Sequence, residues 1–456
     1  MHAPTPKLDA ATVQRVAHAL ADVPRAAYSV PHVYPSAAPA YSPAPLEERP
    51  PVSAPELRLY VHVPFCRYHC TFCYFAVRIG ADRATMARYV AALRRELEHA
   101  PVGKPLSQLF VGGGTPTALP PELLDELLEA VFQRNPPVPG HVHTVETSPE
   151  TISQAHIEVL RRHGIGRVSM GIQSLDSDIL GTVHRKQTSE GALAACELLV
   201  GSGLIANVDL IYGLPGQTEA SFLHDLDAIA ERGVPSFTAY SLRVNERTPV
   251  SRVLDGGNPF ELAGLMRWRA FVQRNAEERG YTQTRWHTFK RLDTIAARHQ
   301  RLPCFDEELS GYQLGIGNSA RSHLGYTVYR NHEQLPVYLR RVEAGQSPVE
   351  QVFRLDAEDR YTQAIARSLG DGRSLARAQY QRSFGHPIEA DFGEVLEGLR
   401  SGGLLDDDGE TLALSELGRL VYDLVTLAFY PRRAQEWLAG RSERASFVQL
   451  EAVGAP

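Results

Sequence analysis

The sequence is poor in cysteine, with only five in 456 residues. That number is too small for a scaffold held together by disulfide bonds, and it is odd. Neither sign of charge predominates, since 47 basic and 53 acidic residues give a net charge of −6, so a broadly basic nucleic-acid-binding surface is not indicated. No run approaches about 18 uninterrupted apolar residues, so a transmembrane helix is not indicated either.

The beginning of the sequence lacks the basic region, apolar core and small-residue cleavage site of a secretory signal. We therefore expect a cytoplasmic protein in a reducing compartment, with no membrane partner. In such a compartment, clustered cysteines indicate metal binding or catalysis before disulfide formation. Three of the five cysteines (Cys66, Cys70 and Cys73) fall within eight residues, and the functional interpretation depends on them.

Composition divides the chain into three parts. Residues 1–55 are rich in Pro and Ala and predict an extended arm with one short helix around Ala11–Leu20. Residues 56–290 alternate strand patterns with helix patterns six times. Residues 291–456 lose this repeat and predict a smaller α+β domain. Within it a helix, a hairpin over Gly402–Leu414 and a further helix resemble a winged helix.

Each of the six predicted strands is apolar and is followed by a helix pattern. Six such units in series predict an α/β fold with a parallel sheet, either open or closed into a barrel. Polar and glycine-rich segments follow the strands, which favours a partial (β/α)6 TIM-like barrel whose ligands bind at its mouth. The predicted strands are Leu57–Val63, Gln108–Val111, His143–Thr147, Val168–Ile172, Ile205–Ile211 and Ser236–Leu242.

The clustered cysteines have the spacing C-x3-C-x2-C and follow the first predicted strand. Thiolates are soft ligands that suit iron–sulfur clusters and zinc. Three thiolates leave one iron of a four-iron cluster open to an exogenous ligand. Structural zinc usually needs a fourth protein ligand, which His62 or His69 would supply.

In this position the motif resembles that of radical S-adenosylmethionine (SAM) proteins. The resemblance implies a [4Fe–4S] cluster on Cys66, Cys70 and Cys73 whose open iron chelates SAM, and reductive cleavage of SAM to a 5′-deoxyadenosyl radical. Motifs after later strands extend the resemblance to the HemN-like family, that of oxygen-independent coproporphyrinogen III dehydrogenase, over residues 57–245. They are Val111-Gly-Gly-Gly-Thr115-Pro116, Val145–Pro149, Ser169–Asp176 and Asn207–Thr218.

HemN-like proteins bind two SAM molecules, and the resemblance assigns nine residues to them. The residues implied for the cluster-bound SAM are Tyr60, Gly113 and Glu146. Those implied for the second SAM are Phe72, Gly114, Thr115, Gln173, Arg185 and Asp209. These residue types suit the ligand, because carboxylates accept hydrogen bonds from ribose or ammonium groups, a guanidinium pairs with a carboxylate, and a phenyl ring stacks on adenine.

One departure from the dehydrogenase pattern guides the choice of activity. That enzyme has a further cysteine two residues after the third cluster cysteine, where this chain has Phe75. We therefore favour the class C radical SAM methyltransferase or cyclopropanase branch, which transfers a methyl-derived carbon to an sp2 carbon of a small-molecule or peptide natural product. Tyr74, in place of the aspartate of the haem chaperone HemW, agrees with this choice. HemW, the dehydrogenase itself and an anaerobic haem-degrading methyltransferase are the alternatives.

No general base stands out in the sequence, and the candidates for catalytic groups are Tyr240, His62 and Cys304. The inserted segment Arg285–Glu308 suggests a site tailored to its substrate. We expect an electron donor such as flavodoxin or ferredoxin, and a monomer.

The winged-helix-like module does not indicate a nucleic-acid partner. Its hairpin carries Asp406, Asp407, Asp408 and Glu410. This acidic charge opposes contact with phosphates, so we expect no nucleic acid to bind.

Overall fold

The computed structural model describes residues 8–24, 42–43, 50–99, 101, 103–244, 248–254, 260–303 and 305–445. The chain forms two compact units. The larger unit comprises Tyr41–Leu242 and Trp268–Leu355, and the smaller comprises Met1–Ala40, Arg243–Arg267 and Asp356–Pro456. This division differs from the predicted domains, because the strands between residues 311 and 354 extend the large sheet instead of joining the C-terminal module.

The described part of the larger unit contains a 13-stranded sheet, and the six predicted strands are its centre. These six strands are mutually parallel and adjacent in chain order, as predicted. They are β2 (Leu57–Val63), β5 (Leu106–Gly113), β6 (Thr144–Thr147), β7 (Arg167–Gln173), β8 (Ile205–Tyr212) and β9 (Ser236–Ser241).

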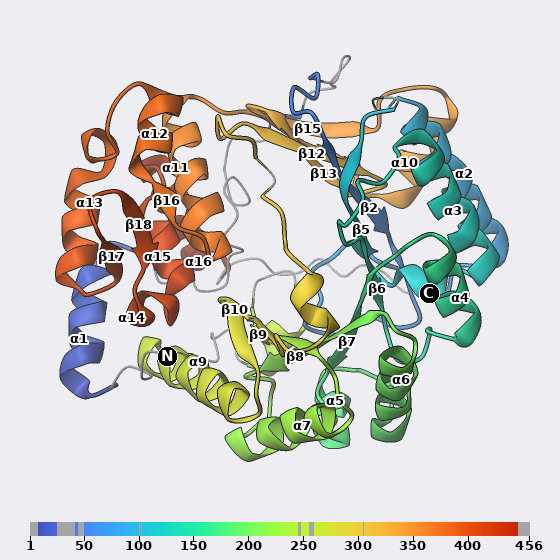
Figure 1. Cartoon of the computed structure of the whole chain (residues 1–456), viewed down its shortest axis with the longest axis horizontal. Coiled ribbons are helices and arrows are strands. Elements are labelled where there is room, and N and C mark those ends of the chain that lie inside the picture. The colour runs from blue at the N-terminus through green and yellow to red at the C-terminus, as the bar shows by residue number, and fades with distance from the viewer. Residues whose placement is uncertain are drawn as a thin grey trace. The chain divides into compact units, whose positions relative to one another are not determined.

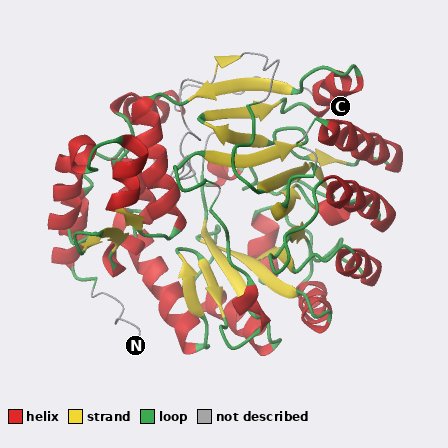
Figure 2. Ribbon diagram, turned by 45° about the horizontal axis from the view of Figure 1, so that its top comes forward, coloured by secondary structure: helices red, strands yellow, loops and turns green. Residues whose placement is uncertain are grey.

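Helices follow these strands and cover the outer face of the sheet (Figure 2). They are α2 (Arg83–Glu98), α3 (Pro121–Arg134), α4 (Gln154–Arg162), α5 (Ser177–Thr182), α6 (Ser189–Gly201) and α7 (Glu219–Glu231). At the start of α2, the Asp82 carboxylate caps the helix by accepting a hydrogen bond from the Thr85 N–H at 2.8 Å. No described helix is both long and apolar enough to cross a bilayer.

Both edges of the sheet carry strands that the sequence pattern did not reveal (Figure 1). On one side β12 (Gly311–Ile316) runs parallel to β2, and β13 (Arg321–Gly325), β14 (Thr327–Asn331), β15 (Val349–Arg354) and β1 (Ser42–Pro43) follow antiparallel. On the other side β9 pairs with β11 (Thr288–Lys290), which pairs with β10 (Thr282–Arg285). Among the described strands the order begins at β1 and ends at β10, so the sheet is a partial barrel.

A buried carboxylate fastens the turn between β12 and β13 to the helix layer. Glu96 of α2 is 1% exposed. It accepts hydrogen bonds from the Gly317 N–H at 2.8 Å, from Asn331 Nδ2 at 2.8 Å and from the Tyr338 hydroxyl at 2.7 Å. Gly317 has φ +98°, and a Cβ there would lie 2.6 Å from the His62 carbonyl oxygen. The turn therefore packs directly on the end of β2, where the cysteine motif begins.

We predict that Glu96→Ala destabilises the fold strongly. The substitution leaves three buried donors without their acceptor, and each loss of this kind costs about 1 kcal/mol or more. We expect the free energy of unfolding, measured by urea denaturation, to fall by roughly 3 kcal/mol. Glu98→Ala, at an exposed position of the same helix, is the control and should change it little. Equal stability of the two variants would contradict the structural role of Glu96.

The smaller unit contains the predicted helix–hairpin–helix module. Helix α13 (Glu389–Ser401) leads into the hairpin of β17 (Leu405–Asp407) and β18 (Thr411–Leu414), and β16 (Leu375–Ala376) completes a three-stranded sheet. The other α-helices described wholly within this unit are α1 (Ala10–Ala19), α8 (Val250–Val253), α11 (Ala357–Ser368), α12 (Arg377–Phe384), α14 (Glu416–Arg419), α15 (Tyr422–Ala428) and α16 (Arg432–Ala445). Helix α9 (Leu262–Glu278) begins in this unit and ends in the larger one. Asp407 of the hairpin pairs with Arg377 and Arg400, so part of the acidic charge is used inside the module.

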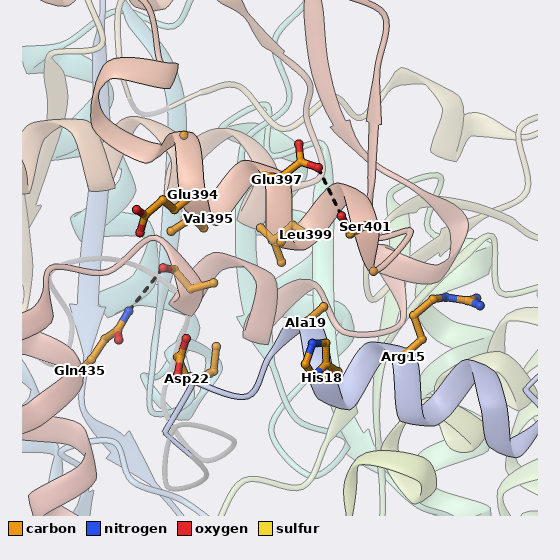
Figure 3. Close-up of a pocket in the computed structure, with 15 residues that line it drawn as sticks. Arg15, His18, Ala19, Asp22, Glu394, Val395, Glu397, Leu399, Ser401 and Gln435 are labelled. Atoms are coloured by element: carbon orange, nitrogen blue, oxygen red, sulfur yellow. Dashed lines mark hydrogen bonds between the residues drawn. The ribbon is translucent and has the colours of Figure 1, made fainter.

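A cavity of about 780 Å³ lies in this unit between α1 and α13 (Figure 3). Charged and polar side chains line much of it, among them Arg15, His18, Asp22, Glu394 and Glu397. None of the residues that the sequence analysis assigned to a site lines this cavity. We therefore built the candidate site on the larger unit.

Candidate active site

The three clustered cysteines lie on one loop that leaves the C-terminal end of β2. Two short strands close the base of this loop, since β3 (Phe65–Cys66) pairs in parallel with β4 (Arg78–Ile79). A turn in which the Cys73 N–H donates to the Cys70 carbonyl at 3.0 Å brings two of the cysteines close together. We call residues 64–79 the cysteine loop.

The thiols share a confined environment. Cys70 is buried, and Cys66 and Cys73 are half-buried. Thr115 Oγ1 lies 3.6 Å from Cys66 Sγ, and Arg185 Nη1 lies 3.6 Å from Cys70 Sγ. Burial raises the pKa of each thiol, that of Cys73 to about 12, and the Arg185 guanidinium opposes the rise.

This donor set fits an iron–sulfur cluster. Thiolates are the ligands that such clusters use, and each binds its own iron. A single ion needs its ligands around one point, and the described residues contain no group of three Cys, His, Asp or Glu side chains of that kind. When bound, the cluster supplies the electron for reductive cleavage of SAM. The guanidinium of Arg185 stabilises the thiolate form of Cys70, because it places a positive charge beside the sulfur.

The glycine-rich segment after β5 packs on the cysteine loop. The Gly114 N–H donates to the Val63 carbonyl at 2.8 Å, and the Thr115 N–H donates to the Phe65 carbonyl at 2.7 Å. A Cβ at Gly114 would lie 2.7 Å from the carbonyl carbon of Pro64, and one at Gly113 would lie 2.5 Å from the His62 ring. The glycines are therefore required by packing, a reason that the motif alone did not reveal.

Two half-buried carboxylates, Glu146 of β6 and Asp209 of β8, project from neighbouring strands. Glu146 Oε2 accepts a hydrogen bond from the Gly113 N–H at 3.1 Å. Asp209 accepts from the Ser169 hydroxyl at 3.1 Å and from Asn207 Nδ2 at 2.9 Å. Burial, and then the charge of Asp209, raise the pKa of Glu146 to about 7. Burial also raises the pKa of Asp209.

The end of β7 brings Gln173 and Arg185 together. Gln173 has φ +72°, a left-handed conformation that costs a residue with a side chain about 1 kcal/mol or more. Arg185 donates to the Gly171 carbonyl and to Gln187 Oε1, the latter at 2.7 Å. Its guanidinium also lies 5.9 Å from the centroid of the Tyr68 ring. These contacts fix Arg185 between β7 and the cysteine loop.

His62 has contacts that favour a positioning role over the predicted catalytic one. Its Nδ1 lies 3.0 Å from the Tyr60 hydroxyl, and its Nε2 lies 3.3 Å from the Ala76 carbonyl oxygen. Burial lowers the pKa of His62 to about 4, so the ring is neutral at pH 7. The imidazole thus links β2 to the cysteine loop through Nε2, while Nδ1 is held by Tyr60 of the same strand.

The other predicted residues take different positions. Tyr60 stacks on Phe110 with centroids 6.2 Å apart, and Phe72 is half-buried on the cysteine loop. Tyr240 ends β9 and is 42% exposed. Desolvation, and then the carboxylates of Asp209 and Glu146, raise the pKa of Tyr240, so its hydroxyl stays protonated at neutral pH and can donate a hydrogen bond, but it is a poor acid. Cys304 lies outside the described residues.

Comparison with known proteins agrees with this geometry. Residues 60–229 match the model of the radical SAM superfamily. Over these residues the chain resembles a radical SAM domain. Its cofactors are therefore a [4Fe–4S] cluster and SAM.

Curated proteins resemble the chain well beyond the radical SAM domain. Oxygen-independent coproporphyrinogen III oxidase of Pseudomonas aeruginosa is 28% identical over 82% of this chain and 85% of its own length. The haem chaperone HemW of Mycobacterium tuberculosis is 29% identical over 82% of this chain and 95% of its own length. The solved structure of Escherichia coli coproporphyrinogen III oxidase (HemN) has the same fold, with a TM-score of 0.72 and 24% identity over 88% of this chain and 96% of that chain.

The sequence analysis missed polar residues inside the radical SAM domain. Arg167 precedes Ser169 by two positions on β7, and Asn207 precedes Asp209 by two positions on β8. Residues two apart on a strand share a face, and the hydroxyl of Ser169 bonds to both Asn207 and Asp209. The polar alternation along β7 and β8 was the available signal that one face of these strands is a ligand-binding interior.

We predict that Glu146→Gln stabilises the ligand-free protein at neutral and alkaline pH. The folded-state pKa of Glu146 is raised from 4.5 to about 7, so the folded chain holds its proton longer than the unfolded chain does. The contribution of Glu146 to stability therefore falls as the pH rises from about 4.5 to 7. At pH 8 the variant should be more stable by up to about 3 kcal/mol in urea denaturation, and below pH 4.5 the two should agree. A difference that does not depend on pH would contradict the assigned pKa.

Proposed function

We propose that the chain is a radical SAM enzyme that binds two SAM molecules at the mouth of the partial barrel and acts on a carboxylated tetrapyrrole. The observation that carries the first part is the convergence of three thiols, the Gly113–Glu146 edge and Arg185 at the C-terminal ends of the parallel strands. The curated relatives support the second part, since the oxidase and the haem chaperone are named for tetrapyrroles and the likeness extends over most of each chain.

In this proposal the residues divide between the two SAM molecules. The cluster-bound SAM lies against Tyr60, Gly113 and Glu146. The second SAM lies against Phe72, Gly114, Thr115, Gln173, Arg185 and Asp209. The division follows the family resemblance, and members of both sets lie near the end of β2, because Gly113, Gly114 and Thr115 follow one another from the end of β5.

The chain's own groups then bind and orient the ligands. Glu146 and Asp209 accept hydrogen bonds from ribose hydroxyls or an ammonium group. The Tyr240 hydroxyl keeps its proton, since its pKa is raised by desolvation and the nearby carboxylates, and it donates a hydrogen bond. His62 holds the cysteine loop on β2. A flavodoxin or ferredoxin supplies the electron.

We predict that the protein, reconstituted anaerobically with iron and sulfide, forms 5′-deoxyadenosine from SAM and a strong reductant. Cys66→Ser, Cys70→Ser and Cys73→Ser should each remove the cluster absorbance and the product. Cys196→Ser is the matched control, because Cys196 is buried in α6, and it should keep both. Failure of the wild-type protein to cleave SAM, with the cluster present, would refute the enzymatic function.

A second candidate function, methyl transfer to a natural product, follows from the residues after Cys73. Phe75 occupies the position where the resemblance leads us to expect a cysteine in the decarboxylating enzyme. Its ring is 48% exposed and stacks on Tyr74 with centroids 4.7 Å apart. An aromatic pair in this position offers an apolar surface instead of a thiol.

We predict that incubation with coproporphyrinogen III gives a product that has lost carbon dioxide, detected by mass spectrometry. Gain of a methyl group labelled from SAM, on this or another substrate, would replace decarboxylation by methyl transfer. Stoichiometric haem binding with a Soret band, without turnover of either kind, would assign the chain to the chaperones instead.

A further inference from the structure

A segment of the larger unit crosses the inner side of the curved sheet. It follows a short 3-10 helix, η3 (Ile295–Arg298), and is drawn in gold within the curve of the strands in Figure 1. Arg58 of β2 donates to the Leu302 carbonyl, and Lys290 of β11 donates to the His299 carbonyl. The Tyr312 hydroxyl donates to the Pro303 carbonyl at 2.8 Å. The segment is thus tied to strands on both sides of the interior.

Register shows that two buried cations point into the same interior. Arg167 lies on the face of β7 that carries Ser169. Lys290 of β11 is paired with Ser236 of β9, and the Ser236 hydroxyl donates to Asn207 Oδ1 at 2.7 Å. Both cations are 7% exposed. The Arg167 Nε is buried and has no hydrogen-bond partner among the described residues.

Positive charge accumulates around one neutral imidazole on the crossing segment. Burial, and then the charges of four cations, lower the pKa of His299 to about 2. The four are Arg167, Lys290, Arg301 and Arg285. Burial, and then Arg167 and Arg285, lower the pKa of Lys290 to about 8, so Lys290 still carries its charge at pH 7. We call these four residues the cationic floor.

We propose that the cationic floor binds a carboxylate group of the substrate and so sets which end of the substrate faces the SAM residues. Buried cations raise the free energy of the fold unless an anion is near, and a guanidinium binds a carboxylate through two parallel hydrogen bonds. Asp209 and Glu146 lie close enough to Arg167 to influence its pKa, but we assign both to SAM. Arg167 and Lys290 are the buried members of the floor, whereas Arg285 is half-buried and Arg301 is exposed. A further anion beside the two buried cations would lower the free energy of the fold, and we assign that role to a carboxylate of the substrate.

The position of the floor suits such an anchor. Arg167 influences the groups that we place around SAM, since Asp209, Tyr240 and Glu146 all act on its pKa. Arg301 in turn acts on the pKa of Tyr240. A carboxylate held here lies beside the Tyr240 hydroxyl and the second SAM. The inference rests on the proposed function, because that function defines the substrate as carboxylated.

The test uses two variants of the floor and one matched control in the reconstituted full chain. Arg301→Gln and Lys290→Met each remove one charge from the floor. Arg298→Gln is the control, because Arg298 is an exposed arginine of η3 that is not among the charges acting on His299. The probes are glutarate, a simple dicarboxylate, its neutral analogue glutaramide at equal ionic strength, and coproporphyrin III.

We expect glutarate, but not glutaramide, to raise the melting temperature of the wild type and of Arg298→Gln. The shift should be at least halved in the two floor variants, and their affinity for coproporphyrin III, followed by fluorescence, should fall tenfold or more. Unchanged glutarate shifts and porphyrin affinity in both floor variants would overturn the inference.

SAM also carries a carboxylate, so SAM cleavage without substrate separates the two possible ligands. Cleavage at wild-type rate and with wild-type KM for SAM in the floor variants supports a substrate carboxylate as the ligand. A raised KM for SAM, with porphyrin affinity unchanged, would assign the floor to SAM and overturn the inference. Absence of SAM cleavage in the wild type would refute the proposed function, whereas the glutarate shifts would still report on the floor.

Discussion

The candidate site depends on how the C-terminal end of β2 is held in place. From the helix side, the Tyr89 hydroxyl lies 2.7 Å from the His62 carbonyl oxygen, and Gly317 packs against that same oxygen. From the site, Gly113 packs against the ring of His62, which in turn binds Ala76 of the cysteine loop. His62 thus connects the packed core to the cysteine loop. Cluster chemistry requires fixed geometry around a reactive group. The arrangement of the candidate site therefore depends on the contacts that hold His62.

The face of β7 and β8 that points into the partial barrel is polar, whereas the interior of most barrels is apolar. The buried polar residues on this face therefore need hydrogen-bond partners. Asn207 donates to Ser169 and Asp209 and accepts from Ser236, so its amide satisfies several strands at once. Such a network allows Asp209 and Arg167 to remain inside the fold, although each is desolvated. This polar face contributes little hydrophobic free energy to the fold. The apolar contacts between the strands and the outer helices must supply that stability instead. Leu93 of α2 and Leu124 and Leu127 of α3, all fully buried, are part of that outer core.

Sequence reasoning reached the central architecture because its signals are local. Leu57–Val63 has the same bounds in the structure as in the prediction. The place of the edge strands in the sheet was missed because β12 pairs with β2 across more than 250 residues of chain, and no local pattern records such a partner. The same limit applies to the site. The spacing of the cysteines could be recognised in the sequence. The role of His62 could not, because it depends on contacts with Gly113 and Ala76 that form only in the folded chain. Lys290 likewise gains its surroundings from β9 and the crossing segment, so its position in the sequence gave no signal.

A sheet that is not closed by hydrogen bonds has two edges, and each edge is a template on which another chain can add a strand. At one edge of the described sheet the last strand is β1, of which Ser42 and Pro43 are described. These two residues pair with Val352 and Gln351 of β15. Proline has no amide hydrogen to donate to an added strand. Pro43 therefore interrupts the hydrogen-bond ladder at this point of the edge, where a complete barrel would rely on ring closure to prevent pairing with another sheet.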